Sequence, residues 1–590
     1  MRNEPLRNTL RVALVAITAS AAVGCGFKPS AAPPTTGTGG TTAIDGGLGT
    51  GGTAGAPGKT GATSLTITPT AATMMVTNGG PAQTQQFSVS GQVNGQTVDL
   101  TTQVLYALSS SGVVTIDKNG LATSVGTKGG LVTVTASMGA VSVTATLTVY
   151  YTFTGTDPGM TGSITSDPTP IFSTTDNDTA RSPSLVYPND GVLFPPNITG
   201  IEIHFMPGAN NTLFEVILSG KYTTVNAFIR CVAMGTSGCI YQPDPGLWSA
   251  IAIGNAGQGQ VSLVVRGTDD TGTSVGDSTP FHMQFSKANI DGALYYWTTT
   301  GKSAVMRWDF AGSTQSAQAY LTPANTGVTS CIGCHALAPD GTKMVVSANG
   351  QGDGRLLLWD IANNKALQPY PLSQRSQFES WNSDGTQFVG VFGDKQNTNN
   401  YNQAGPVNLN LFDGMTGMVT STIALGGLRG DHPDWSKSTD APNTIVFTSA
   451  DATAATSDQR PATGGIDYVQ YDGTAWGAPQ TLVPSVLGKN RYYPAIAPDG
   501  DLVVYDESTC TTVPAAAGLA PDKSCDADTD ATATMFLTSI SSGGSAPIPL
   551  TNANGPGVAD MGATALTNSF PKWAPFVEQL TEQQQLVWLT

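Results

Sequence analysis

A short turn motif recurs through the second half of the chain, and it limits the available folds more than any other feature. Each copy follows an aromatic or apolar residue, and the clear copies contain Asp-Gly and precede a short β-forming run. The spacing of about 40 to 60 residues is typical of four-stranded repeat units that bury their faces by stacking on their neighbours. We therefore expect a β-propeller. Clear copies lie at 338–341, 382–385 and 497–500, and weaker copies lie at 432–436 and 570–575.

The repeats resemble those of the TolB-type propeller, whose blades open with an aromatic residue followed by Ser-Pro-Asp-Gly. If 292–297 opens the first blade, residues 289–590 hold six blades. The last blade ends at 586–590 with too few residues to be complete. Either the chain is cut short there, or a strand from elsewhere closes the ring.

Short runs of alternating polar and apolar residues precede the repeats and predict two antiparallel sandwiches. In the first, at 64–150, the sequences 109–123 and 133–136 resemble the bacterial Ig-like group 2 module, which implies a spacer or adhesive domain without chemistry. The second, at 151–288, is expected to be Ig-like or fibronectin-like. The predicted fold class is therefore all-β, with two β-sandwich domains followed by a six-bladed TolB-like propeller.

The first residues carry an export signal at 1–24. Three arginines lead into an apolar run at 12–23, which is too short to span a bilayer. The sequence 22–25 resembles the lipobox of bacterial lipoproteins, although Ala stands where Leu is commonest. This resemblance implies cleavage before Cys25, lipid on its sulfur and, because Gly26 is not Asp, an anchor in the outer membrane. The alternative is a plain cleaved signal with an incidental cysteine.

Composition separates the tether from the domains and excludes one class of partner. Residues 25–63 are dominated by Gly, Thr, Ala and Pro, and we expect them to form a flexible tether. Lys and Arg number 26 against 42 Asp and Glu, which gives a formal net charge of -16. No basic cluster follows the N-terminus, so we expect no nucleic-acid partner.

The seven cysteines divide into Cys25 and three close pairs. In an oxidising compartment, two of these pairs are expected to form disulfides that close surface loops, namely Cys231 with Cys239 and Cys510 with Cys525.

The third pair lies in Cys331-Ile-Gly-Cys334-His335, the pattern of covalent c-type haem attachment. In this pattern two thiols add to the haem vinyl groups and the adjacent histidine binds iron. The motif predicts a haem c held by Cys331, Cys334 and His335. Two alternatives stay open, a dithiol or disulfide and a metal site such as zinc, although zinc normally needs a second pair at regular spacing.

Equivalent positions of the repeats include a candidate for the second iron ligand. Aligning the copies on their turns places Cys334, Phe378, His432, Tyr493 and Phe570 together, and these side chains should ring one mouth of the central channel. His432 is the candidate second ligand, and the alternative is that its imidazole caps a turn. Other candidates are an open iron position or a methionine: Met344, Met415, Met418 or Met561.

Weaker patterns carry less chemistry. The G-x-S-x-G sequence at 272–276 lacks the strand-turn-helix context of a nucleophile elbow. The acidic runs 526–530 and 176–178 could hold a surface calcium ion, although the first lacks the Gly and Glu of an EF-hand loop. His204 and His282 lie in the second sandwich and are expected to be ordinary strand residues.

Two functions follow from these observations. The first is a surface-anchored mono-haem protein that passes electrons to a redox partner or senses redox state. The second is a haem-free TolB-like binding or scaffold lipoprotein that recognises a cell-envelope protein or glycan. An enzymatic role ranks below both, because no acid or base beside the haem can be named.

Overall fold

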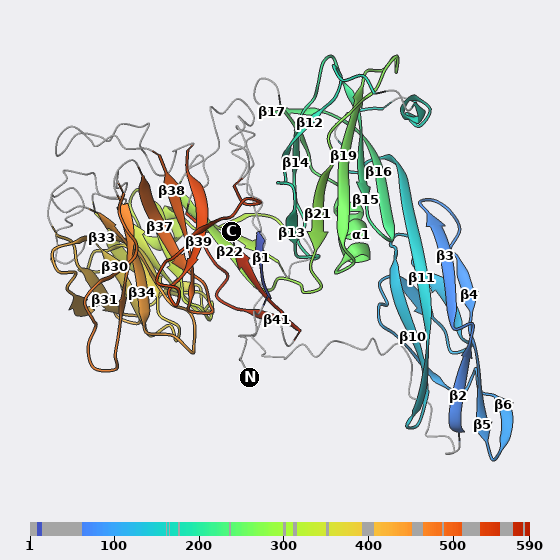
Figure 1. Cartoon of the computed structure of the whole chain (residues 1–590), viewed down its shortest axis with the longest axis horizontal. Helices are drawn as coiled ribbons and strands as arrows, with labels where there is room; N and C mark the ends of the chain where they lie inside the picture. The colour runs from blue at the N-terminus through green and yellow to red at the C-terminus, as the bar shows by residue number, and fades with distance from the viewer. Residues whose placement is uncertain are drawn as a thin grey trace, which may run out of the picture.

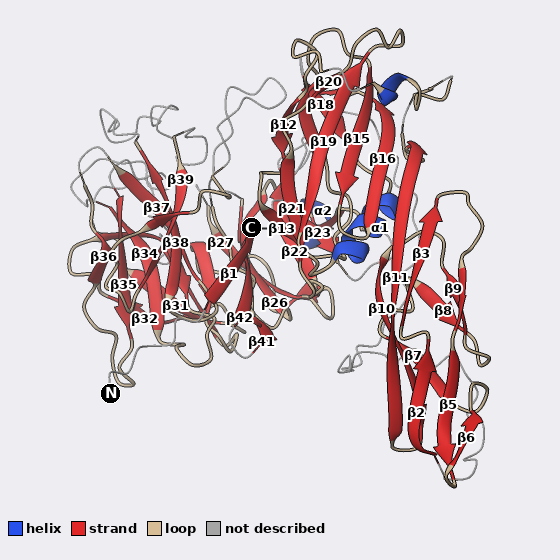
Figure 2. Cartoon of the chain, turned by 45° about the vertical axis from the view of Figure 1, so that its right-hand side comes forward, coloured by secondary structure: helices blue, strands red, loops and turns tan. Residues whose placement is uncertain are grey.

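A computed structural model describes most of the chain between residues 62 and 589 (Figure 1). The described residues are 9–14, 62–160, 162–164, 166–174, 177–234, 238–298, 303–310, 315–349, 353–391, 406–450, 464–486, 489–509, 532–554, 570–581 and 584–589. Strands dominate this part of the chain, as Figure 2 shows. The mostly β fold class is confirmed.

The first sandwich alternates buried and exposed residues along its strands. In β10, for example, Val132, Val134 and Ala136 are buried. This period of two buries one face of each strand against the opposite layer. Its strands are β2 (Ala62–Thr68), β3 (Ala71–Thr77), β4 (Thr84–Gln86), β5 (Ser88–Val93), β6 (Gln96–Asp99), β7 (Leu105–Leu108), β8 (Val114–Ile116), β9 (Leu121–Ser124), β10 (Gly130–Met138) and β11 (Val141–Thr156).

Strand β11 belongs to both sandwiches. Its first part pairs antiparallel with β10, and from Tyr151 onward it pairs in parallel with β16 (Thr223–Arg230). One ten-stranded sheet therefore runs through both sandwiches, and the expected boundary after residue 150 falls inside this strand.

The second sandwich packs a four-stranded sheet and a helix around the rest of this sheet. The sheet order is β12-β14-β18-β17, and Trp248 of helix α1 is buried against Phe194 and Phe285. The elements are η1 (Ile171–Ser173), β12 (Ser184–Tyr187), β13 (Val192–Phe194), β14 (Ile203–Met206), β15 (Leu213–Ser219), β17 (Val232–Met234), β18 (Gly238–Tyr241), α1 (Pro245–Asn255), β19 (Gln260–Thr268), β20 (Gly276–Asp277) and β21 (Phe281–Phe285).

The all-β prediction misses helix α1. The Asp244 side chain accepts hydrogen bonds from the backbone N–H groups of Gly246 and Leu247, and Pro245 occupies the first turn. An N-cap aspartate followed by proline is a typical helix start.

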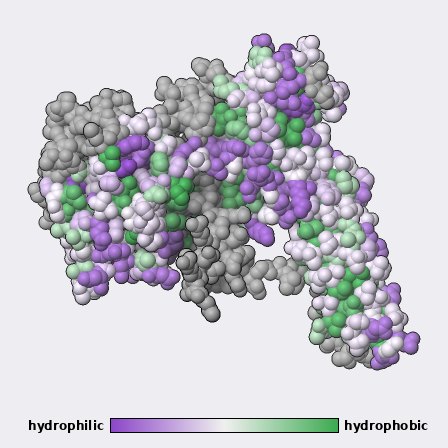
Figure 3. Space-filling model, viewed as in Figure 1, coloured by the Kyte–Doolittle hydropathy of each residue, from purple (hydrophilic) through white to green (hydrophobic). Residues whose placement is uncertain are grey.

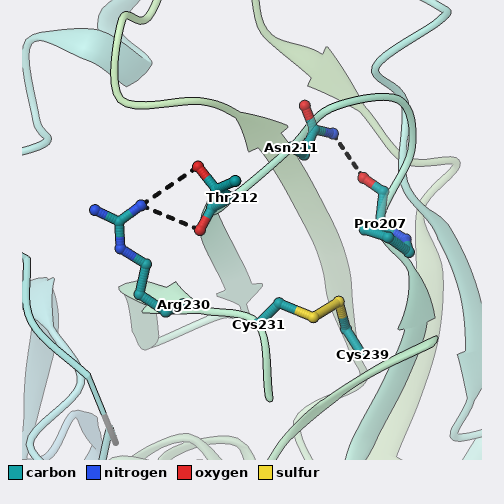
Figure 4. Close-up of a disulfide and its surroundings, with 6 residues drawn as sticks. All are labelled: Pro207, Asn211, Thr212, Arg230, Cys231 and Cys239. Carbon is teal, nitrogen blue, oxygen red and sulfur yellow. Dashed lines mark hydrogen bonds between the residues drawn. A yellow bond between two sulfur atoms is a disulfide. The ribbon is translucent and has the colours of Figure 1, made fainter. Parts of the chain in front are cut away.

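The predicted disulfide between Cys231 and Cys239 is present, with 5.3 Å between the Cα atoms (Figure 4). It joins the start of the β17–β18 hairpin to β18. Beside it, the Arg230 guanidinium donates to the backbone and side-chain oxygens of Thr212. Cys25 and the predicted Cys510–Cys525 pair lie outside the described residues.

Residues from 293 onward form a series of small antiparallel sheets, which we call the array. The first array sheet is β22 (Ala293–Thr298), β23 (Ala304–Asp309) and β24 (Gln318–Leu321), followed by the short helix α2 (Pro323–Thr326). The second to fifth array sheets each have four strands that follow one another in sequence: β25 (Ile332–Leu337), β26 (Lys343–Ala348), β27 (Arg355–Asp360) and β28 (Lys365–Ala366); β29 (Gln377–Trp381), β30 (Gln387–Val391), β31 (Leu409–Asp413) and β32 (Val419–Ile423); β33 (Arg429–Trp435), β34 (Thr444–Ala450), β35 (Gly464–Gln470) and β36 (Gln480–Val483); β37 (Asn490–Ile496), β38 (Leu502–Ser508), β39 (Thr534–Ser539) and β40 (Ile548–Pro549).

The first strands of these sheets lie against one another, β22 on β25, β25 on β29, β29 on β33 and β33 on β37. They are therefore the inner strands of the array. Apolar side chains between neighbouring sheets form separate cores, such as the one that joins Val345 and Leu358 to Trp381 and Phe388. Each sheet buries its faces by stacking, as the repeat pattern predicts.

The sixth array sheet contains β41 (Glu578–Thr581) and β42 (Gln584–Leu589). Its third strand is β1 (Thr9–Leu14), which pairs in parallel with β42. Leu586 and Trp588 share a core with Leu294 and Trp308 of the first array sheet. A strand from elsewhere in the chain thus lies beside the last hairpin.

Candidate functional site

The inner strands carry equivalent residues at equivalent places. In the second to fifth array sheets, the residue used for the sequence alignment donates its backbone N–H across the turn that ends the strand, and the same one-residue register shift precedes it. The alignment of these four repeats is therefore confirmed in space. The donors are Ala338, Asn382, Ser436 and Ala497, whereas Ala574 donates to the carbonyl of Trp588 on β42.

Four of the five residues that lie four positions earlier have a left-handed backbone. Their φ angles are 55° at Phe378, 43° at His432, 49° at Tyr493 and 61° at Phe570. Residues with a Cβ rarely adopt this conformation, so the surrounding sheets must hold it. Cys334, the fifth member, does not have a positive φ.

These four rings meet in one group, which we call the aromatic cluster (Phe378, His432, Tyr493 and Phe570). The His432 ring centroid lies 3.8 Å from that of Phe378, 4.2 Å from that of Tyr493 and 6.0 Å from that of Phe570. His432 and Tyr493 are 5% and 4% exposed, whereas Phe570 is 44% exposed. Four of the five side chains predicted to lie at the channel mouth therefore pack together, with Phe570 exposed.

His432 is enclosed within the cluster. Its Nδ1 lies 2.9 Å from an Asp431 carboxylate oxygen, but neither ring nitrogen makes a hydrogen bond of good geometry within the described part of the chain. The rings of Phe378 and Tyr493 pack against the imidazole, and its role as a second iron ligand stays a prediction.

The C-x-x-C-H sequence runs into β25 and spans the register shift between Ile332 and His335. Asn349 donates its N–H to the carbonyl of Cys331 over 2.7 Å, so the ladder with β26 reaches this residue. Cys331 and Cys334 form no disulfide with each other, and both are half-buried.

His335 belongs to the ladder between β25 and β26, where it pairs with Val346. Its Nδ1 lies 3.2 Å from the carbonyl oxygen of Gly333, and burial lowers the pKa of the imidazole. A one-residue register shift lies between Ile332 and His335, so the simple alternation of side chains is interrupted at Cys334. Both ends of the motif, Cys331 and His335, are held in the pairing with β26. Haem attachment at Cys331, Cys334 and His335 stays a prediction.

The methionine candidates are also dispersed. Met344 is fully buried in the core between the first and second array sheets. Met415 and Met418 are half-exposed near the turn between β31 and β32. Met561 lies outside the described residues.

Several buried ionisable groups lie on the inner strands, and the sequence analysis missed them. Asp434 accepts hydrogen bonds from the Ser380 hydroxyl over 2.7 Å and from the Ile496 N–H over 2.9 Å. Its carboxylate also lies 3.3 Å from the Lys437 ammonium. Although burial alone would raise the pKa of Asp434, the charges of Lys437 and Lys572 and these hydrogen bonds hold it below its usual value. Asp434 therefore ties together the third, fourth and fifth array sheets.

Two further acids are buried without a cationic partner among the described residues. Glu379 accepts a hydrogen bond from the Ser347 hydroxyl over 2.7 Å, and burial raises its pKa to about 7. Asp506 accepts one from the Phe570 N–H over 3.1 Å, and burial raises its pKa well above the usual value. Asp506 thus holds the backbone of one member of the aromatic cluster. Sequence position alone gives no sign of this burial.

The remaining sequence patterns have structural roles where they are described. The Ser274 hydroxyl of the G-x-S-x-G sequence donates to Asp178, and β20 rather than a helix follows. His204 is buried on β14 beside Glu202, and His282 lies on β21 beside Asp190. The acidic run 526–530 and Asp176 lie outside the described residues.

Neither a metal cluster nor a membrane-crossing helix is found in the part of the chain that the structure describes. No group of three or more His, Cys, Asp or Glu side chains there is arranged to hold a metal ion. No described helix is both long and apolar enough to span a bilayer.

Comparison with known proteins shows a distant structural similarity to TolB-like β-propellers. A protein assigned as TolB from Agrobacterium tumefaciens is 20% identical, with a TM-score of 0.29 over 44% of this chain and 79% of its own. TolB from Acinetobacter baumannii is 13% identical, with a TM-score of 0.25 over 52% of this chain and 63% of its own. An oligogalacturonate lyase in complex with manganese is 15% identical, with a TM-score of 0.27 over 44% and 61%.

No family model matches the chain, and no curated protein matches it in sequence. Because the TM-scores are low, these similarities carry no argument about function.

Proposed function

We propose that this chain is a lipid-anchored recognition scaffold of the cell envelope, in which a six-bladed TolB-like propeller is carried by two Ig-like sandwiches. The aromatic cluster is the observation that supports this function best. Left-handed backbone at four equivalent positions costs about 1 kcal/mol or more of folding free energy for each residue. The protein keeps these unfavourable conformations at the positions where the rings meet.

A protein partner suits the chemistry of the cluster. Phe570 is half-exposed, and the Lys572 ammonium lies 5.2 Å from its ring centroid. The buried ring nitrogens of His432 contribute no exposed polar group. A surface of phenylalanine rings with a nearby cation favours apolar and acidic side chains, whereas glycan recognition usually requires several exposed hydrogen-bonding groups.

Photo-crosslinking in cells tests this function. A photoreactive residue at Phe570 should give a discrete protein adduct, whereas the same residue at Met415, which is 50% exposed on an outer turn, should not. Co-sedimentation with peptidoglycan tests the glycan alternative. Adducts of equal yield at both positions, or binding to glycan alone, would contradict a protein partner.

The anchor rests on the sequence at 22–25 and is tested separately. We expect a mature chain that begins at a lipid-modified Cys25, with Cys25→Ser preventing the modification. Intact mass measurement of the membrane-bound protein reports the start of the chain and the lipid together.

A further inference from the structure

The sixth array sheet differs from its neighbours in how it is completed. The second to fifth array sheets each take four consecutive strands from the same stretch of chain. The sixth takes the β41–β42 hairpin and a bridge from Trp573 to Leu589 from its own stretch, and β1 supplies the third strand (Figure 2). Every other strand pair described within the array is antiparallel, whereas β1 and β42 are parallel.

The contact between β1 and β42 is a main-chain contact over six residues, from Thr9 opposite Gln584 to Leu14 opposite Leu589. Three side chains of β42 pack against other parts of the chain. Leu586 and Trp588 pack into the core shared with the second sandwich, Leu589 packs against the fifth array sheet, and all three are at most 1% exposed. What β42 offers on this side is therefore a row of backbone donors and acceptors.

The slot that β1 occupies is bounded on another side by β13, the last strand of the ten-stranded sheet. An occupant must therefore be extended and narrow, since it lies beside both β42 and β13. A helix or a lipid chain cannot supply the regularly spaced main-chain hydrogen bonds that a strand edge requires.

Residues 9–14 fall within the export signal at 1–24. Removal of this signal takes away the strand that pairs with β42 and exposes its backbone edge. We propose that the edge of β42 then accepts an extended segment of a partner polypeptide, which enters parallel to β42 in the register of β1. This inference rests on the proposed processing at Cys25.

A synthetic peptide of residues 8–15 serves as the probe for this edge. The full chain should not bind it, because β1 fills the slot. The full chain with Arg11→Pro and Val12→Pro should bind it with one-to-one stoichiometry, because adjacent prolines remove main-chain donors from β1. The matched control with Arg11→Ala and Val12→Ala keeps those donors and should behave like the full chain. A chain that starts at residue 26 should bind like the proline variant.

Backbone methylation distinguishes strand pairing from apolar adhesion. In a parallel pair, alternate residues of the peptide bond to β42. N-methylation of one alternate set should weaken binding at least tenfold, and methylation of the other set should leave it unchanged. Equal effects of the two sets, or no saturable binding to the opened chains, would overturn the proposal. A dimer of the opened chain in sedimentation, without peptide binding, would do so as well.

These outcomes are independent of processing in the cell, because the opened chains are made directly. A chain that is retained with residues 1–24 in vivo would contradict the proposed anchor while leaving the binding result intact.

Discussion

In the second array sheet Cys334 takes the place that Phe378, His432 and Tyr493 take in the next three sheets. The register shift and the turn that follow are the same, yet only the three later residues have a left-handed backbone. The aromatic residues gain from this conformation because it brings their rings together. A small thiol gains no comparable packing, and Cys334 has no positive φ although the same register shift occurs there. Equivalent sequence position therefore fixes the place of a residue in the array but not its conformation.

The largest expected effect concerns the C-x-x-C-H sequence. We expect protein made in a host with haem-attachment machinery to be colourless, because the pairing with β26 holds both Cys331 and His335 and the His335 Nδ1 lies 3.2 Å from the Gly333 carbonyl oxygen. A pyridine haemochrome spectrum measures covalent haem, and thiol titration of the unfolded chain should find Cys331 and Cys334 unmodified. A haemochrome that disappears in Cys334→Ala would show instead that β25 rearranges and that the haem prediction is right.

The next effect concerns Asp434, whose carboxylate links the fourth array sheet to its two neighbours. The second array sheet lacks such a link, because Ala336 occupies the equivalent position. We expect Asp434→Ala to lower the free energy of unfolding by about 3 to 5 kcal/mol, because it leaves the half-buried Lys437 without its carboxylate. Urea denaturation measures this loss. The exposed Asp440→Ala is the matched control, and a loss below about 1 kcal/mol would show that the link is weak.

Glu379 makes the third array sheet sensitive to pH. Its pKa in the folded chain is about 7, against 4.5 as the ordinary value, so the folded state holds the proton more tightly. The stability that the protonated side chain contributes is complete below pH 4.5 and is lost as the pH rises through 7. The total is about 3 kcal/mol.

Denaturation measured across this pH range should show a smaller decline in Glu379→Gln than in the unmodified chain. The exposed Asp384→Asn should leave the decline unchanged. Identical pH profiles for Glu379→Gln and the unmodified chain would mean that Glu379 reaches solvent.

The smallest effect is the difference in stability between glycine and alanine variants. It should have opposite signs at Phe378, which has a positive φ, and at Cys334, which does not. At Phe378 the glycine variant should be more stable than the alanine variant by about 1 kcal/mol, because glycine adopts positive φ without a Cβ clash. At Cys334 the order should reverse by about 0.5 to 1 kcal/mol, because glycine only adds entropy to the unfolded chain. Paired thermal denaturation of the four variants gives both differences. If the glycine variant were the more stable, or the less stable, at both positions, the backbone conformations of Phe378 and Cys334 would not differ as described.

The repeat pattern predicted the array well because its turns are local features of the sequence. The alignment of Ala338, Asn382 and Ala497 depends on residues close together in the chain, and all three have the same turn bond. The nearby cysteines at 231 and 239 were likewise paired correctly. The buried acids were missed because the partners of Asp434 come from sheets more than fifty residues away in sequence.

Helix α1 was missed for a different reason. Asp244 and Pro245 mark its start, but the apolar residues that follow, including Trp248, have no clear helical period because most of them are buried. A segment buried on most sides lacks the amphipathic pattern by which helices are recognised.

In the view of Figure 3, the apolar residues of the surface lie in small groups among polar ones, including over the first sandwich.

Figure 1 shows β11 running from the first sandwich into the second. At about 3.3 Å per residue, its sixteen residues give a continuous span of about 50 Å. A pull applied at one sandwich reaches the other through a hydrogen-bonded ladder rather than a hinge. The continuous strand would hold the two sandwiches in a fixed orientation and would resist bending between them. It would therefore keep the array at a set distance from the first sandwich.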